Sequence, residues 1–114
     1  MSARDISVLL DDMLESVVTI RQYVHGVTEA TFQADRMIQD AVIRRLEILG
    51  EAASQVPTDY CAQHPEIPWG AMTGMRNRLI HGYFLVDLAI VWRTVQTDVS
   101  ALETPLRALR QQLP

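Results

Sequence analysis

The sequence predicts an all-α fold: an up-and-down antiparallel bundle of four main helices plus a short extra helix. Apolar residues recur at steps of three and four along most of the chain, which is the spacing of one helix face. The stripes of the first and last segments approach a heptad repeat, which is typical of bundled helices. No segment has the alternation of a strand. With 114 residues, 48% hydrophobic and 21% charged, the chain is expected to form one globular domain over residues 1–114.

The first two long helices are bounded by residues that begin or end helices. Ser2 is expected to cap the first helix, which His25-Gly26 ends. Thr28 or Thr31 is expected to cap the second, which stops before Pro57. The stripe of the first helix consists of Ile6, Leu9, Leu10, Met13, Val17, Ile20 and Val24. The stripe of the second consists of Met37, Ile38, Ala41, Val42, Leu46, Leu49, Ala52 and Ala53.

A short helix and a longer one follow in the second half of the chain. Residues 58–64 are expected to form the short helix. Residues 65–68 begin and end with proline and are expected to form a bend. The next helix should start at the last of these prolines or at Trp69, because a missing N–H costs little in the first turn. It should end close to Gly82.

The last helix is expected to begin after Asp87, whose carboxylate can cap free N–H groups. Pro105 lies inside its pattern and should kink or break it. Its stripe consists of Leu88, Val91, Val95, Val99, Leu102, Leu106 and Leu109. The chain contains no internal repeat, low-complexity tract or inter-domain linker.

The composition is that of a cytoplasmic protein. The one cysteine, Cys61, forbids an internal disulfide and suits a reducing compartment. No apolar run approaches the ~20 residues of a membrane span. The net charge of −4 argues against a high-affinity RNA-binding module, because non-specific affinity comes mainly from cations that neutralise phosphates. Arginines cluster only at positions 44–45 and 76–78.

The most informative segment runs from Met75 to Tyr83, where Arg76 stands five positions before His81. Arginine offers phosphate oxygens a planar fork of cationic donors, and histidine exchanges protons near neutrality. A base for the ribose 2′-hydroxyl and a cation for the attacked phosphate suffice to cleave RNA without a metal. The spacing alone also fits a solvated helix end whose positive charges complement the helix dipole.

On an ideal helix, Arg76 and His81 lie about 140° apart and do not share a face. Two arrangements would bring them together. Gly82 can end the helix and free His81 from a helical direction while the long Arg76 side chain curls toward it. Alternatively, copies from two subunits meet across a dimer interface. Both arrangements remain open from spacing alone.

Several segments together resemble the HepT-like toxins, which are small all-helical proteins of the HEPN superfamily paired with a minimal nucleotidyltransferase (MNT) antitoxin. The resemblance covers nearly the whole chain, and its motifs stand in the family's order and spacing. The Leu-Glu-Ile-Leu-Gly-Glu-Ala box and the Gly82-Tyr83 pair make it specific, since an arginine-x4-histidine element alone is not. The matching segments are 41–53, 65–69, 76–83, 86–88 and 91–92.

The resemblance implies the same fold, a homodimer with its active cleft between protomers, and an RNase that acts without metal. His81 would be the general base and Arg76 would stabilise the scissile phosphate. Asn77 would orient His81 or donate to phosphate, and Arg78 is a substrate contact or a plain surface charge. Tyr83 would accept adenylyl groups from the antitoxin, which silences the toxin. DNA would resist cleavage because it lacks the 2′-hydroxyl.

No metal or cofactor site is expected. Cys61 and His64 have a metal-like spacing, but no second cysteine exists to complete a zinc site. Glycine-rich phosphate loops and nucleophile elbows are absent from the sequence.

Four other residues are expected to have structural roles. Arg44 and Glu47 either pair at their i, i+3 spacing or buttress the cleft. Trp69 and Trp92 are interpreted as packing anchors and not as platforms for stacked bases.

A second hypothesis comes from another functional class. In it, the chain is a non-catalytic helical dimer that binds a nucleotide or serves as accessory subunit of a minimal nucleotidyltransferase. The acidic net charge and the 140° separation favour this alternative. The arginine-x4-histidine-x-tyrosine pattern favours the enzyme.

Overall fold

The computed structural model describes residues 3–82 and 86–114, and every regular element in these ranges is helical. The prediction of an all-α fold is therefore confirmed. The elements are α1 (Ala3–Val24), α2 (Glu29–Ala34), α3 (Arg36–Gln55), α4 (Thr58–Gln63), α5 (Trp69–His81), α6 (Leu88–Arg93), the π-helix η2 (Thr94–Val99) and α7 (Glu103–Gln111).

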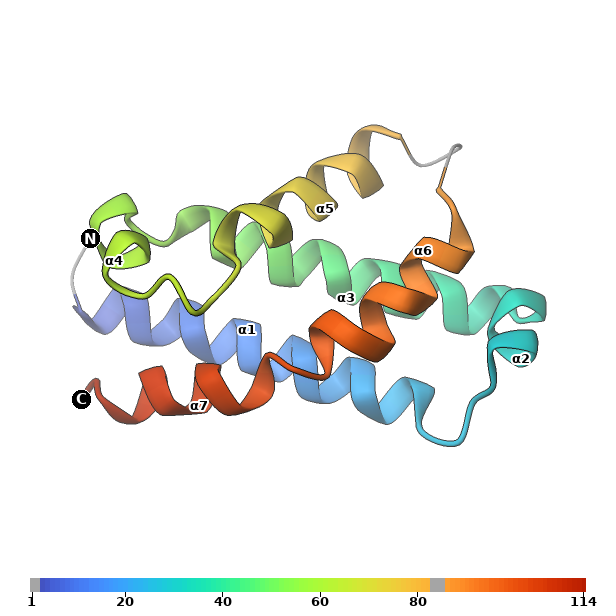
Figure 1. The fold of residues 1–114 in the computed structure, drawn as a ribbon, viewed down its shortest axis with the longest axis horizontal. Coiled ribbons are helices and arrows are strands. Elements are labelled where there is room, and N and C mark those ends of the chain that lie inside the picture. Colours follow the sequence, from blue (N-terminus) through green and yellow to red (C-terminus); the bar gives the residue numbers. More distant parts are fainter. Residues whose placement is uncertain (1–2, 83–85) are drawn as a thin grey trace.

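Four long segments alternate in direction, as an up-and-down bundle requires (Figure 1). They are α1, α3, α5 and the run formed by α6, η2 and α7. Helix α3 packs closely on α1 and on α5, and α7 returns along α1. The two short helices α2 and α4 lie at opposite ends of the bundle. None of the helices in the described part of the chain is both long and apolar enough to cross a membrane.

The second predicted helix is two helices, and the break falls at Asp35. Thr28 caps α2 by accepting a hydrogen bond from the Thr31 N–H at 3.1 Å. Asp35 caps α3 by accepting one from the Ile38 N–H at 3.2 Å. The prediction that Met37 belongs to the buried stripe is wrong, since its side chain is 78% exposed. Met37 is the second residue of α3, so the error is confined to the first turn of that helix.

The last predicted helix is interrupted, as Pro105 suggested, but the break comes before the proline. Asp87 caps α6 by accepting from the Ala89 N–H at 2.9 Å, which confirms the predicted start. The helix then widens into η2, and turns at 100–102 precede α7. Pro105 is the third residue of α7, where no intrahelical N–H bond is lost.

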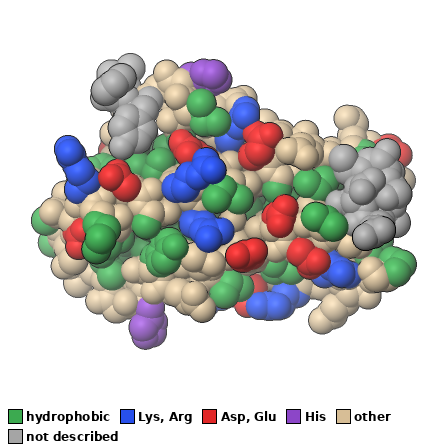
Figure 2. All heavy atoms as spheres, turned by 180° about the vertical axis from the view of Figure 1, so that it is seen from behind, with side chains coloured by type: hydrophobic (Ala, Val, Ile, Leu, Met, Phe, Trp, Pro, Cys, Tyr) green, Lys and Arg blue, Asp and Glu red, His purple; other side chains and the backbone are tan. Residues whose placement is uncertain are grey.

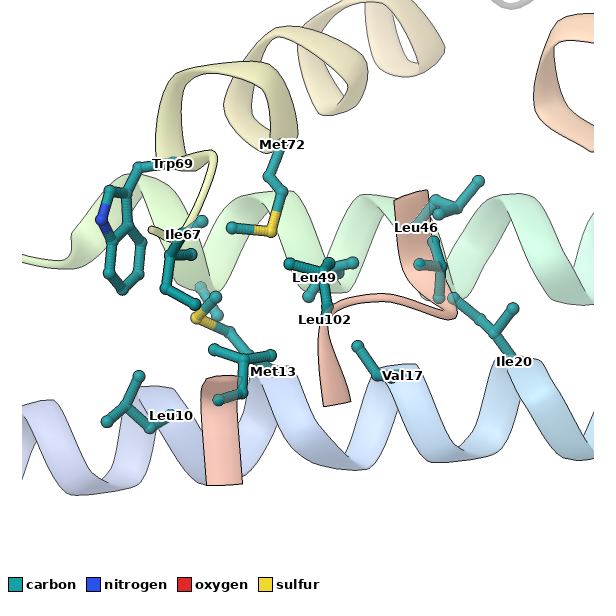
Figure 3. Close-up of a cluster of buried hydrophobic side chains, with 14 of the residues drawn as sticks. Leu10, Met13, Val17, Ile20, Leu46, Leu49, Ile67, Trp69, Met72 and Leu102 are labelled. Carbon is teal, nitrogen blue, oxygen red and sulfur yellow. The ribbon is translucent and has the colours of Figure 1, made fainter. Parts of the chain in front are cut away.

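The core lies between α1 and α3 and is closed by the segment around Trp69 and by the C-terminal run (Figure 3). One face of α1 points into it, and its four central side chains have no exposed surface: Leu10, Met13, Val17 and Ile20. They face Leu46 and Leu49 of α3, together with Ile67, Met72 and Leu102.

Both tryptophans pack, as predicted. Trp69 is 8% exposed, and its indole N–H donates to the His64 carbonyl oxygen at 2.9 Å. Trp92 is half-buried against Phe32, with ring centroids 5.2 Å apart. Trp69 therefore ties the first turn of α5 to the loop before it, which sets where the candidate site helix begins.

Ion pairs join α7 to α1. Arg21 binds Glu103, and Arg110 binds Asp11 with a 2.8 Å contact. Hydrogen bonds from Arg107 and Arg21 hold the pKa of the Glu103 carboxyl below its ordinary value. A carboxyl with a lowered folded-state pKa stabilises the fold at neutral pH, and this contribution is lost as the pH falls through that pKa. Because these groups are partly exposed, each pair contributes little.

Ser16 is a polar residue in the middle of the core, fully buried and without a hydrogen-bond partner for its hydroxyl among the described residues. Replacing it by alanine removes an unsatisfied group and leaves only a small void. We expect Ser16→Ala to raise the free energy of unfolding by about 1 kcal/mol. Met13→Ala, in the same helix face, should lower it by about 2–5 kcal/mol. Urea unfolding of both variants checks this, and a destabilised Ser16→Ala would contradict it.

Candidate active site

Helix α5 carries the residues singled out from the sequence, within the predicted bounds. It begins at Trp69, directly after Pro68, and ends at His81. The Gly82 N–H closes its last turn by donating to the Arg78 carbonyl oxygen at 2.8 Å. The candidate side chains at positions 76, 77, 78 and 81 therefore stand on the last two turns of one helix.

Arg76 faces α3 and is held at both terminal nitrogens. Its Nη2 lies 2.6 Å from the Oε2 of Glu51, and its Nη1 donates to the Asn77 Oδ1 at 2.7 Å. The side chain is 27% exposed. Its Nε is buried and has no hydrogen-bond partner among the described residues. The guanidinium is thus oriented by two oxygens and can reach a ligand only through its outer nitrogens.

The Arg76 side chain lines a groove of about 370 Å³, here called the α3–α5 groove. Two arginines, Arg44 and Arg76, share it with three carboxylates, so its charge is mixed. Arg44 pairs with Glu47 at 3.5 Å, which is one of the two roles the sequence left open for them. The groove is lined by Leu9, Asp12, Arg44, Glu47, Ile48, Glu51, Ala52, Gln55, Arg76 and Ile80.

His81 lies on another side of the same helix. Its side chain is exposed and lines a separate cavity of about 440 Å³ between α5 and α6, together with Arg78. Arg76 does not line this cavity, and His81 does not line the α3–α5 groove. The helix does end before Gly82, yet within one protomer His81 still lines a different cavity from the groove that Arg76 lines. This is the separation expected from about 140° on a helix.

Of the remaining candidates, one contacts Arg76 and one lines the cavity of His81. Asn77 is exposed, and its Oδ1 accepts a hydrogen bond from Arg76, a contact that neither of its predicted roles included. Arg78 is exposed and lines the His81 cavity. Tyr83 lies outside the described residues.

The structure adds Gly50 and Glu51 to the candidate site. Both belong to the box in the middle of α3, and the sequence suggested no role for either. Glu51 forms the ion pair with Arg76, and Gly50 lies directly beneath that side chain. No local spacing links them to Arg76, because the contact depends on how two helices pack.

A metal site finds no support in the described residues, where no three His, Cys, Asp or Glu side chains group closely enough to hold an ion. Cys61 and His64 have other contacts. The thiol lies 3.8 Å from the Val56 carbonyl oxygen, and the His64 Nδ1 lies 3.3 Å from a carboxylate oxygen of Glu66. Both residues belong to the packing around α4.

The fold and α5 together define a class: small all-helical proteins in which an arginine and a histidine five positions apart stand near the end of one helix. The chain belongs to the HepT-like family, whose model, described as ribonuclease HepT-like, matches residues 13–109.

Curated relatives agree with this assignment. A probable ribonuclease HepT of Thermococcus cleftensis is 41% identical over 102 residues, which cover 90% of this chain and 93% of the relative. A candidate RNase of Methanocaldococcus jannaschii is 39% identical and covers 90% and 94%. Another, from Caldanaerobacter subterraneus, is 32% identical and covers 90% and 92%. No solved structure matches the chain.

Proposed function

We propose that the chain is the RNase toxin of a HEPN/MNT toxin–antitoxin pair, and that it cleaves cytoplasmic RNA by metal-independent transesterification. The observation that carries the proposal is that one helix, α5, bears both an oriented, partly exposed Arg76 and an exposed His81, in a member of a ribonuclease family. These two side chains supply the cation and the base that the reaction needs.

The reaction needs no atom from outside the RNA and the protein except for proton exchange. His81 removes the proton of a ribose 2′-hydroxyl, and the freed oxygen attacks the adjacent phosphorus. The bond from phosphorus to the 5′-oxygen breaks, and that oxygen takes up a proton. Arg76 stabilises the negative charge that builds on the phosphate oxygens. The products are a 2′,3′-cyclic phosphate and a 5′-hydroxyl.

A homodimer completes the site in this proposal. Within one protomer Arg76 and His81 line different cavities, so one protomer does not aim both at one phosphate. A second copy that contributes His81 beside the first copy's Arg76 removes this difficulty. Closed two-fold dimers create two such composite sites, because the same surface is used on both subunits.

The charge distribution supports local and weak binding of RNA. The net charge is −4, and acidic and basic side chains are interspersed on the face shown in Figure 2. RNA would be held mainly near α5, with Arg78 as a phosphate contact beside His81. Few phosphate contacts favour release of the product, and the binding that they provide weakens as the salt concentration rises.

Control by the partner nucleotidyltransferase is part of the proposal. Tyr83, two positions after His81, would accept adenylyl groups from that antitoxin. Their phosphates would attract the arginines of α5, and the attached nucleotide would occupy the substrate's space.

The purified protein is expected to cleave RNA in excess EDTA and to leave single-stranded DNA of the same sequence intact. The reason is that the nucleophile is the RNA's own 2′-hydroxyl and that protein side chains supply the base and the cation. Gel analysis of end-labelled RNA checks the cleavage and shows whether the ends are cyclic phosphate and 5′-hydroxyl. A strict requirement for added divalent metal, or 5′-phosphate products, would rule out this mechanism.

A second candidate function is a non-catalytic accessory subunit of the nucleotidyltransferase. Two observations favour it: Arg76 and His81 line separate cavities, and the Glu51 carboxylate already engages Arg76. The same assay separates the two functions. An accessory subunit binds the nucleotidyltransferase or a nucleotide and leaves RNA uncut in every buffer.

A further inference from the structure

Helices α3 and α5 meet at Gly50 with no room for a side chain. A Cβ atom added there would lie 2.3 Å from the Arg76 Cβ and 2.6 Å from the Met72 carbonyl oxygen. Both atoms belong to α5 and are one helical turn apart, and the oxygen is backbone. Glycine is unfavourable in the middle of a helix compared with alanine, so its presence here has a packing reason. The reason is the close approach of Arg76.

Other helical glycines lack this constraint. Gly70, in the first turn of α5, has nothing within 4 Å of an added Cβ. At Gly74 the nearest atom is the Arg78 Nη1 at 3.8 Å, which is ordinary van der Waals contact. The tight contact is therefore specific to the point where α3 supports Arg76.

The next residue of α3 holds the other end of the same side chain. Glu51 Oε2 lies 2.6 Å from the Arg76 Nη2, while Asn77 accepts from Nη1. Between these contacts, the buried Nε lacks a partner among the described residues. A buried, unsatisfied donor is unfavourable by itself, and the ion pair to Glu51 offsets part of that cost. Gly50 therefore sets the position of the Arg76 Cβ, and Glu51 sets the position of its guanidinium.

We propose that Gly50 and Glu51, consecutive on α3, are positioning residues for Arg76. Because Gly50 has no side chain, the Cβ of Arg76 can pack against the α3 backbone. Glu51 holds the guanidinium in the α3–α5 groove. This inference rests on the proposed function of Arg76 in RNA cleavage. Neither residue touches the reacting atoms, so both act through the arginine.

The two roles of Glu51 have opposite effects on binding and on turnover. Its carboxylate orients the guanidinium, which favours the transition state, and it also lowers the positive charge offered to RNA. Removing the charge should therefore lower kcat without raising KM. A merely structural residue would instead lower thermal stability and leave kcat per folded molecule unchanged.

The first test compares Gly50→Ala with the matched control Gly70→Ala. The added methyl group at position 50 must push α5 away from α3, and a shift of about 1 Å in a catalytic group costs roughly a hundredfold in rate. We expect kcat to fall by about that factor while circular dichroism still reports a folded helical protein. Gly70→Ala should keep wild-type kcat. A folded Gly50→Ala protein with wild-type kcat would overturn the proposal.

The second test leaves the packing intact and applies even if Gly50→Ala does not fold. Glu51→Gln removes the charge that contacts Arg76, and Glu15→Gln removes an exposed carboxylate of α1 that does not line the α3–α5 groove. We expect kcat to fall on the order of tenfold for Glu51→Gln, with KM unchanged or lower, in line with the loss of one charge-assisted contact. Glu15→Gln should keep wild-type kcat.

A double-mutant cycle separates this inference from the proposed function. In the Arg76→Ala background, Glu51→Gln should have no further effect on the residual cleavage, since it acts through the missing arginine. If Glu51→Gln lowers kcat equally in both backgrounds, or not at all, the positioning role is refuted. If instead Arg76→Ala itself cleaves like wild type, the proposed function of Arg76 fails.

Discussion

Replacing either Arg76 or His81 by alanine is expected to lower RNA cleavage by about 10²- to 10⁴-fold, the usual contribution of one acid–base or charge-stabilising group. Induction of either variant alone should no longer slow bacterial growth at an expression level at which the wild type does. Arg93→Ala is the matched control, because Arg93 is an exposed arginine at the end of α6, away from the candidate residues. Wild-type cleavage by both site variants would remove the catalytic assignment.

Mixing the two inactive variants tests how the site is built. If the proposed dimer is correct, a heterodimer of Arg76→Ala and His81→Ala subunits contains one intact composite site, formed by the arginine of one subunit and the histidine of the other. Random exchange of subunits should therefore restore about a quarter of the wild-type activity. If the mixture stays inactive although the subunits exchange, each site lies within one protomer.

Adenylylation is expected to abolish cleavage completely, which makes it the second large effect. Incubation with the proposed partner nucleotidyltransferase, ATP and Mg²⁺ should add one or more adenylyl groups at Tyr83. In this step the phenol oxygen attacks the α-phosphorus of ATP and loses its proton to solvent, and pyrophosphate leaves with the electron pair of the broken bond. Intact mass and peptide mapping measure the modification, and the RNA assay measures its effect.

Tyr83→Phe distinguishes modification from simple binding. The variant should cleave RNA like wild type and escape silencing, because in the proposed function the phenol accepts the modification and takes no part in catalysis. Tyr23→Phe is the matched control, since Tyr23 is an exposed tyrosine on α1. If the antitoxin silences Tyr83→Phe as fully as wild type, Tyr83 is not the point of control and the antitoxin acts by binding alone.

The long helices could be predicted because their signals are local and repeated. The α1 stripe, the Asp87 cap and the end of α5 before Gly82 all appear where residue spacing predicted them. Two features did not follow from periodicity. The carboxylate of Asp35 splits a pattern that otherwise reads as one helix, and η2 widens a helix whose residues keep a regular stripe. In both, a single turn deviates while the neighbouring apolar pattern continues.

The candidate site, too, could be predicted only where the signal is local in the sequence. Spacing alone placed Arg76 and His81 on different faces of one helix, and the structure puts them in separate cavities. The contact of Arg76 with Gly50 and Glu51 could not be predicted, because it depends on the register between two helices that are far apart in sequence. A contact between two helices does not change the residue spacing within either helix, so the spacing cannot predict the contact.

Among the described helices, α5 packs closely on α3 alone. By contrast, α1 packs on both α3 and α7, and α3 packs on both α1 and α5. In terms of local stability, α5 is a separable unit whose detachment exposes far less apolar surface than global unfolding does. The residues proposed for catalysis therefore reside on a helix that can open without global unfolding. A close glycine contact and an ion pair to α3 raise that opening free energy at the very turn that carries Arg76.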